Sequence, residues 1–187
     1  IKKFHKLVML SSTWQMSSEH NDKKFNIDGD NKLLWRFQPK KLEVESWRDS
    51  LLYVTNELDQ RIGGPPEGEI MTSQRRTLYA TISRTGDKFK SDGFLRLFDF
   101  PAAASTSPKR ASSTVPQQYL FMLNSVFMNN RSKTLGRFLS ESDLNRSKVI
   151  ENIYNKLYSR PPQASEVEIA NAWLGESPDV DRWSLYA

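Results

Sequence analysis

Cysteine is absent from this chain of 187 residues, and histidine occurs only twice. Without cysteine the chain has no disulfide, no thiolate metal site, no thiol nucleophile and no covalent c-type haem attachment. His5 and His20 form neither an HxxxH nor an HxH pattern, so their spacing indicates no metal site. Nothing in the surrounding sequence singles out a histidine acid or base.

Several other functional signatures are lacking. No run of residues approaches the roughly 20 apolar positions that span a bilayer, so we expect no transmembrane segment. There is no Gly-x-Ser-x-Gly nucleophile motif. Gly63-Gly64-Pro65-Pro66 lacks the Lys-Ser/Thr of a phosphate-binding loop. Asp28-Gly29-Asp30-Asn31 begins like a calcium loop, but Pro39 stands where the twelfth-position Glu belongs, so we interpret it as a turn.

Apolar residues are sufficient for a folded core. They make up 37% of the chain, with five Trp and ten Phe, and this composition predicts one globular domain over residues 1–187. The chain starts at Ile1 without Met and ends on an apolar segment at 183–187. We therefore expect a fragment of a larger protein, for which a missing targeting signal carries little weight.

Hydrophobic periodicity predicts a mainly α fold, an irregular helical bundle. We expect a helical part at 1–62, a loop-rich basic insert at 63–113 and a second helical part at 114–187. The helices are expected at 1–12, from Pro39 to Asp59 with a stop at Gly63, from Pro116 through Leu139, from a capping sequence at 140–143 to Arg160, and from the turn that holds Glu166 to Gly175. Each of the last four helices has a face that we expect to be buried. In the helix from Pro39 it carries Trp47, Leu51, Val54 and Leu58, and in the helix from Pro116 it carries Tyr119, Leu120, Leu123, Phe127, Leu135, Phe138 and Leu139. In the helix after 140–143 it carries Val149, Ile150, Ile153, Tyr154, Leu157 and Tyr158, and in the helix with Glu166 it carries Val167, Ala170, Trp173 and Leu174.

The middle of the chain is harder to assign. Residues 76–83 are β-branched and aromatic, which favours one short strand or hairpin, although a short helix fits equally. Phe94 to Phe98 form an apolar cluster, and 102–113 is a small-residue loop that we expect to be disordered. Residues 75–110 hold eight basic and three acidic side chains, a net charge of +5 that equals that of the whole chain. This excess indicates an anionic ligand, an acidic partner or nucleic acid, and a solvated face explains it as well.

The start of the helix at Pro116 is the first candidate site. Proline suits the first helical turn, and Ser113 or Thr114 is expected to cap the free amides, which can hold an anion. The predicted binding set is Arg76, Arg84, Asp99, Arg110, Thr114 and Gln117. It would make the chain a non-enzymatic module that recognises an acidic or sulfated saccharide. The alternative use of these arginines is structural, as partners of carboxylates or helix ends.

A second hypothesis is a polysaccharide-acting enzyme with an Asp/Glu pair. Asp99 is its first carboxylate, because Phe98 and Phe100 would desolvate it and raise its pKa. Trp14 and Trp35 flank a loop and are candidates for stacking on sugar rings. Nucleic-acid binding rests on charge alone, so we expect no specific nucleic-acid partner.

Several motifs in one order carry a family resemblance. They are His5 to Ser18, Asp30 to Phe37, Leu42 to Glu45 with Arg48-Asp49, Arg76 to Tyr79, Phe98 to Pro101, Ser113 to Gln118 and Arg160-Pro161-Pro162. Together the sequence resembles the C-terminal portion of a planctomycete-specific domain of unknown function. That domain is usually the C-terminal part of large exported proteins, which often carry an N-terminal cytochrome c domain and a second uncharacterised domain.

The resemblance implies context and no mechanism, because the family has no established catalytic residues. It implies a periplasmic or cell-surface location, the other domains of the parent protein as partners, and haem c on another domain with no cofactor in this segment. Members commonly have proline where Val126 stands, which implies a kink after Asn124 that Val126 does not itself enforce.

Overall fold

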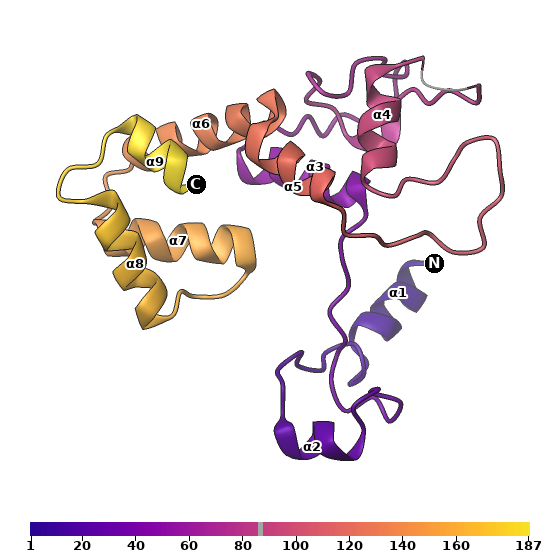
Figure 1. Ribbon diagram of the computed structural model, residues 1–187, viewed down its shortest axis with the longest axis horizontal. Coiled ribbons are helices and arrows are strands. Elements are labelled where there is room, and N and C mark those ends of the chain that lie inside the picture. Colours follow the sequence, from indigo (N-terminus) through magenta and orange to yellow (C-terminus); the bar gives the residue numbers. More distant parts are fainter. Residues whose placement is uncertain (86–87) are drawn as a thin grey trace. The chain divides into compact units, whose positions relative to one another are not determined.

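The computed structural model describes residues 1–85 and 88–187, and over these residues the fold is mainly α, as predicted (Figure 1). Positions 86 and 87, which belong to the predicted basic insert, lie outside the described residues. The described elements are α1 (Lys2–Met9), α2 (Asp22–Ile27), α3 (Val44–Val54), the 3-10 helix η1 (Thr77–Tyr79), α4 (Lys90–Leu97), α5 (Pro116–Asn124), α6 (Val126–Ser140), α7 (Arg146–Tyr158), α8 (Ala164–Leu174) and α9 (Val180–Tyr186). The chain divides into two compact units, residues 1–41 and 42–187.

The first unit is held by polar contacts around one turn. The carboxylate of Asp28 accepts hydrogen bonds from the backbone N–H groups of Lys32 and Leu33, at 3.0 and 2.7 Å. Trp35 Nε1 donates to the carbonyl of Asp28 at 2.8 Å, and Asn31 is the one residue of this unit that is buried. The interpretation of residues 28–31 as a turn is confirmed. The predicted helix at 1–12 ends at Met9, and its apolar side chains are exposed except for Val8, which is half-buried.

The second unit has two apolar clusters. One lies among α6, α7, α8 and α9 and contains Leu135, Leu139, Val149, Ile150, Ile153, Ala170, Leu174 and Trp183. The other joins α3 to α4 through Val44, Phe94, Leu95 and Phe98, with Trp47, Phe100 and Phe121 packed against it. The Trp47 and Phe98 ring centroids are 4.8 Å apart. The predicted apolar cluster at 94–98 is therefore a core.

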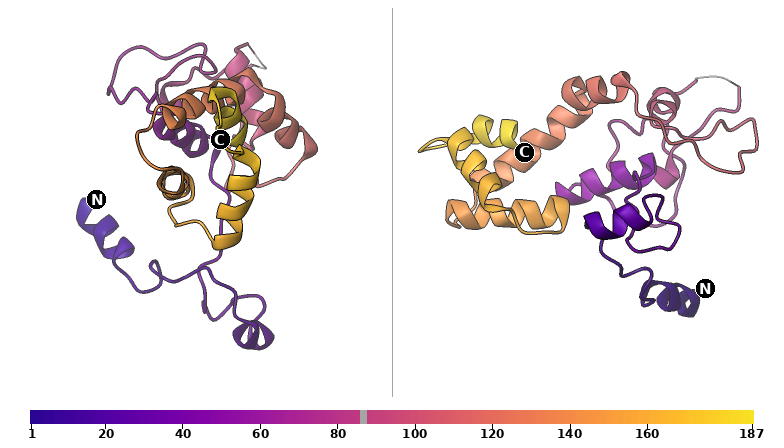
Figure 2. Two further views of the ribbon diagram at one scale, coloured as in Figure 1. Left: turned by 90° about the vertical axis from the view of Figure 1, so that its left-hand side faces the viewer. Right: turned by 60° about the horizontal axis from the view of Figure 1, so that its bottom comes forward.

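Helices α6 and α9 pack closely, and they lie side by side in Figures 1 and 2. Gly136 permits this approach, because a Cβ built there would lie 2.3 Å from Ser184 Oγ and 2.5 Å from its Cα. Asp179 begins α9 by accepting a hydrogen bond from Arg182 N at 2.7 Å. This helix, whose Trp183 is buried, is not predicted from the sequence, where residues 183–187 indicate only an apolar end.

The predicted helix at 39–59 is too long, and its buried face is only partly as predicted: Trp47 and Val54 pack against the apolar clusters, but neither is among the fully buried residues. It runs only from Val44 to Val54, and Thr55 ends it by donating from Oγ1 to the carbonyl of Leu51 at 3.0 Å. The helix stops well before Gly63. Its buried residues are Val44, Arg48 and Leu52, because the helix presents a different face from the one that Leu51 and Leu58 define.

The helix predicted from Pro116 through Leu139 is broken at Ser125. The Ser125 side chain accepts a hydrogen bond from Met128 N at 3.2 Å and so starts α6, even though Val126 is not proline. Phe127, Leu135 and Leu139 are buried as predicted. The prediction was wrong for Tyr119, Leu120, Leu123 and Phe138, which are exposed. The buried residue of α5 is instead Gln118, whose Nε2 donates to the carbonyl of Leu97 at 2.8 Å.

The last two predicted helices are largely confirmed. Val149, Ile150 and Ile153 are buried in α7, although its cap is Asn145 and Tyr158 is exposed. Ala170 and Leu174 are buried in α8, whereas Trp173 is exposed to 47%. Residues 76–83 form no strand: Thr77–Tyr79 is a 3-10 turn, and Ala80 makes one isolated bridge to Glu67. The open alternative of a short helix therefore describes this segment best.

Candidate functional site

Arg48 on α3 lies at the centre of the polar contacts that hold the loop between residues 63 and 79. Its side chain is fully buried. Nη1 donates to the Arg75 carbonyl at 2.9 Å and to Thr77 Oγ1 at 3.3 Å, and Nη2 donates to the carbonyls of Ile70 and Ser73. Burial lowers the pKa of Arg48 to about 10, so the guanidinium stays charged near neutral pH. A buried charge is tolerated here because it is surrounded by acceptors.

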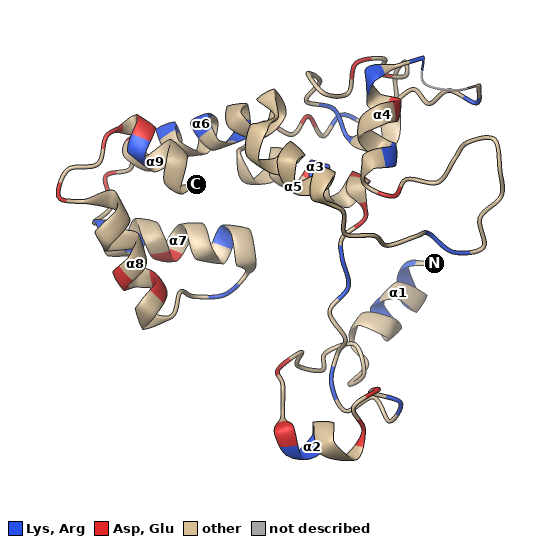
Figure 3. Ribbon diagram, in the orientation of Figure 1, with Lys and Arg blue, Asp and Glu red and all other residues tan. Residues whose placement is uncertain are grey.

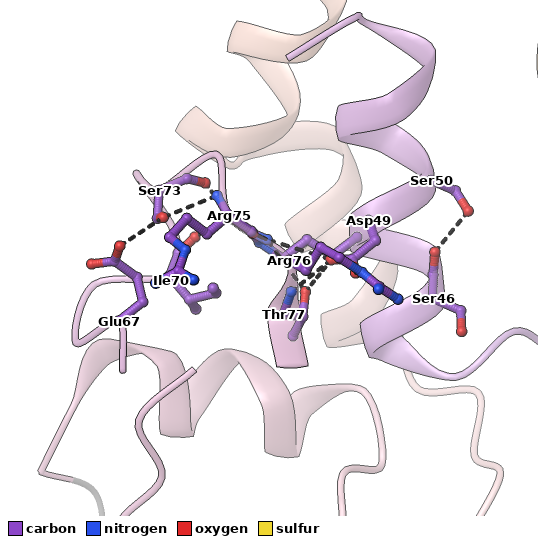
Figure 4. Close-up of polar contacts among 10 residues, drawn as sticks. Ser46, Asp49, Ser50, Glu67, Ile70, Ser73, Arg75, Arg76 and Thr77 are labelled. Atoms are coloured by element: carbon purple, nitrogen blue, oxygen red, sulfur yellow. Dashed lines mark hydrogen bonds and ion pairs between the residues drawn. The ribbon is translucent and has the colours of Figure 1, made fainter. Parts of the chain in front are cut away.

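The two neighbouring arginines complete this arrangement (Figure 4). Arg75 turns back along the loop, donates to the carbonyls of Gly63 and Pro65, and lies 4.0 Å from the centroid of the Tyr79 ring. Arg76 Nε lies 3.5 Å from Asp49 Oδ2 on α3. The other Asp49 oxygen accepts from Thr77 N at 2.8 Å. The Arg76 side chain is half-exposed, and its charge is paired with Asp49 on α3.

Arg110 is paired with Glu45, which lies on α3 one turn before Asp49. Its two terminal nitrogens each donate to a different oxygen of Glu45, both at 2.7 Å, and Nη1 is 3.3 Å from Glu43. Burial alone would raise the pKa of Glu45, but the hydrogen bonds from Arg110 hold it below its usual value. The hydrogen bond to Glu45 raises the pKa of Arg110. This bidentate pair fixes the far end of the 98–115 segment to α3.

Asp99 forms hydrogen bonds within that segment. It adopts a left-handed conformation with φ of 64°, and its carboxylate oxygens accept from Ser113 N at 2.8 Å and Ser113 Oγ at 2.6 Å. The predicted capping of α5 by Ser113 or Thr114 is therefore wrong: the N-cap is Val115, and no side chain caps it. Pro116 stands in the first turn as predicted.

The predicted binding set is divided among separate places in the structure. Arg76 and Arg110 are held on α3, Asp99 holds Ser113, and Thr114 and Gln117 are exposed at the start of α5. Arg84 lies elsewhere, at a pocket beside α4. Sequence reasoning missed Arg48, Glu45 and Asp49, because a charged residue on a helix gives no signal that its partner lies 22 to 65 positions away.

The pocket beside α4 has a cavity volume of about 170 Å³. Ile82, Leu95 and Phe100 give it apolar walls, and Arg84 and Arg96 both line it. The third charged residue at the pocket is Asp92, a buried side chain on α4. Figure 3 shows basic positions at both ends of α4 and in the loop that follows it.

The Asp92 carboxylate already accepts hydrogen bonds from backbone N–H groups. Oδ1 accepts from Ser83 N at 3.1 Å, and Oδ2 accepts from Lys88 N at 3.2 Å and Phe89 N at 3.1 Å. These bonds close the turn that starts α4 and balance the carboxylate charge locally. Elsewhere the pocket lining is basic at Arg84 and Arg96 and apolar at Ile82, Leu95 and Phe100.

No group of three or more His, Asp or Glu side chains in the described ranges is arranged to hold a metal ion. None of the helices that the structure describes is both long and apolar enough to cross a membrane.

Comparison with known protein families gives a match over most of the chain. The family model PSD1, described as a protein of unknown function (DUF1553), matches residues 1–174, and the chain belongs to this family. No curated protein and no solved structure showed a significant match.

Proposed function

We propose that this member of a family of unknown function is a non-enzymatic binding and scaffolding module, and that it recognises an anionic group in the pocket beside α4. The observation that carries the proposal is that Arg84 and Arg96 line a small pocket with apolar walls. Guanidinium groups bind carboxylate and sulfate in a planar, two-pronged geometry. An acidic or sulfated saccharide combines such a group with an apolar ring face, which suits these walls.

The scaffolding part of the proposal is supported by how the chain uses its other arginines. Arg48, Arg75 and Arg146 donate to backbone carbonyls of loops, and Arg110 is paired bidentately with Glu45. A guanidinium already engaged in this way has few donors left for a ligand. These arginines fix loop shape, so Arg110 and Arg76 are less suited to bind the anion than Arg84.

The contacts of the carboxylates favour the module over the polysaccharide-acting enzyme. Acid–base catalysis on a glycosidic bond needs two carboxyl groups that face a substrate. Asp92 instead closes the start of α4, Asp99 accepts two hydrogen bonds from Ser113, and Asp49 accepts from Thr77. Each of these carboxylates has a structural use.

Isothermal titration calorimetry with a sulfated oligosaccharide, an oligogalacturonate and a neutral oligosaccharide tests the proposal. We expect saturable binding of the two anionic probes and about tenfold weaker binding for Arg84→Ala, the loss of one charge-assisted hydrogen bond. Arg137→Ala is the matched control, because Arg137 is exposed on α6 and does not line the pocket. No binding of either anion, or equal weakening by both variants, would contradict the site.

The resemblance to the planctomycete domain supports a further part of the proposal. The parent protein would be exported to the periplasm or cell surface, carry haem c on another domain, and use its other domains as partners of this one. Cell fractionation followed by peptide mass spectrometry and a haem stain of the full-length protein tests this. Peptides confined to the cytoplasm, with no haem on the parent protein, would contradict it.

A further inference from the structure

The first unit, residues 1–41, lacks an apolar core of its own. Its one buried residue is Asn31, whereas ten large apolar side chains in this unit are exposed. Leu7 is exposed to 71%, Leu34 to 56% and Trp14 to 53%. A folded segment of this size gains most of its stability from apolar burial, so such exposure indicates a surface that a partner covers.

The exposed side chains line a groove. One pocket runs along α1 beside Leu7, and a second, of about 360 Å³, reaches Trp14, Leu34 and Phe37. Val8 and Ser11 line both pockets, so the two adjoin, and we call them together the N-terminal groove. Trp14 and Phe37 meet edge to face with centroids 6.1 Å apart and shape one wall.

The charge around this groove has one sign. Lys3 and Lys6 line the part along α1, Arg36 and Lys40 line the deeper part, and no acidic residue lines either. The whole unit holds nine basic and four acidic residues, a net charge of +5. Complementarity therefore requires a partner that is acidic at its edges and apolar where it enters the groove.

We propose that the N-terminal groove binds an acidic amphipathic helix of a partner protein, with its apolar face against Trp14, Leu34 and Phe37 and its carboxylates facing the lysines of α1. A helix-in-groove contact needs a concave apolar floor with charged edges. The deeper pocket at Trp14, Leu34 and Phe37 provides the floor, and the shallow part along α1 provides Lys3 and Lys6 beside it. An anionic bilayer has the right charge, but a flat surface does not fill a concavity, and α1 is only eight residues long. The helix is the better occupant.

Fluorescence anisotropy of the full chain with a labelled Leu/Glu amphipathic peptide tests this. The comparison probes are a scrambled peptide of the same composition and vesicles of phosphatidylcholine with phosphatidylserine. We expect saturable, salt-sensitive binding of the amphipathic peptide that exceeds that of the scrambled one. Binding should weaken about tenfold in Lys3→Glu/Lys6→Glu, because two surface charge pairs become repulsive, and it should also weaken in Trp14→Ala.

The control is Lys23→Glu/Lys24→Glu, which reverses two lysines on α2 that do not line the groove. Far-UV circular dichroism checks that every variant keeps its helix content. Absence of peptide binding, equal binding of the scrambled peptide, equal weakening by the α2 variant, or binding to vesicles alone would each overturn the proposal. This test does not depend on the pocket beside α4, so the two proposals can fail separately.

Discussion

Replacing Arg48 by methionine tests whether one buried guanidinium fixes the loop between residues 63 and 79. Methionine keeps most of the apolar stem, but it removes the guanidinium group, whose carbon lies 5.5 Å from the centroid of the Phe127 ring, and the four hydrogen bonds that this group donates. Three of the acceptors are backbone carbonyls, which cannot hydrogen-bond to one another because a carbonyl oxygen only accepts. Asp49 would also lose a cation at 3.7 Å.

The expected cost is large. A hydrogen bond from a charged donor contributes about 1.5–3 kcal/mol, and each buried acceptor left without a donor costs about 1–3 kcal/mol. The desolvation that lowers the pKa of Arg48 is relieved in the variant and offsets part of this loss. Removing one partner from a buried charged network typically costs about 3–5 kcal/mol, and we expect about 3 kcal/mol here.

Urea unfolding followed by circular dichroism gives the free energy, and limited trypsin digestion at the Arg75–Arg76 bond gives the local effect. We expect a lower unfolding midpoint and faster cleavage. Arg61→Met is the control: that arginine is paired with Asp59 at 2.6 Å but its side chain is 82% exposed, so removing it should leave the unfolding midpoint nearly unchanged. The reasoning is wrong if Arg48→Met costs no more than Arg61→Met and cleavage is unchanged.

Two further outcomes follow from local packing and charge. Gly136→Ala should destabilise the chain by about 2 kcal/mol, because the new Cβ would collide with the Ser184 backbone. Gly93→Ala should stabilise the chain by about 0.5–1 kcal/mol, because Gly93 lies inside α4 and has open space at its Cβ position. Thermal melts should show shifts of opposite sign for the two variants, and shifts of the same sign would refute this. The hydrogen bond from Arg160 lowers the pKa of Glu166 to about 2, so its contribution is present above the unfolded pKa of about 4.5 and is lost as pH falls toward 2. The melting difference between wild type and Glu166→Gln should shrink between pH 5 and 2, and a constant difference would count against it.

The sequence predicts the helices whose apolar spacing is local. Val149, Ile150 and Ile153 fall on one face at helical spacing, and Pro116 marks a helix start, so these needed no tertiary information. Prediction failed where a polar residue takes a core position. Arg48 and Gln118 are buried because carbonyls distant in sequence, in the 63–79 loop and at the end of α4, accept their hydrogen bonds, and helical periodicity carries no information about such acceptors.

The candidate site shows the same division. The excess of arginine in the insert was visible in the sequence, but its use was not. Arg110 pairs with Glu45 across 65 positions, which no local pattern encodes. Of the predicted set, Arg84 lines the pocket that we propose as the binding site.

Because three of the four acceptors of Arg48 are main-chain oxygen atoms, this part of the loop's anchoring does not depend on which side chains the accepting residues carry. Thr72 and Gln74 are exposed there, and the hydrogen bonds of Arg48 go to Ile70, Ser73, Arg75 and Thr77 instead. Related chains could therefore diversify these positions under selection while retaining the same backbone path, and a protein engineer could graft new residues onto it with little risk to folding.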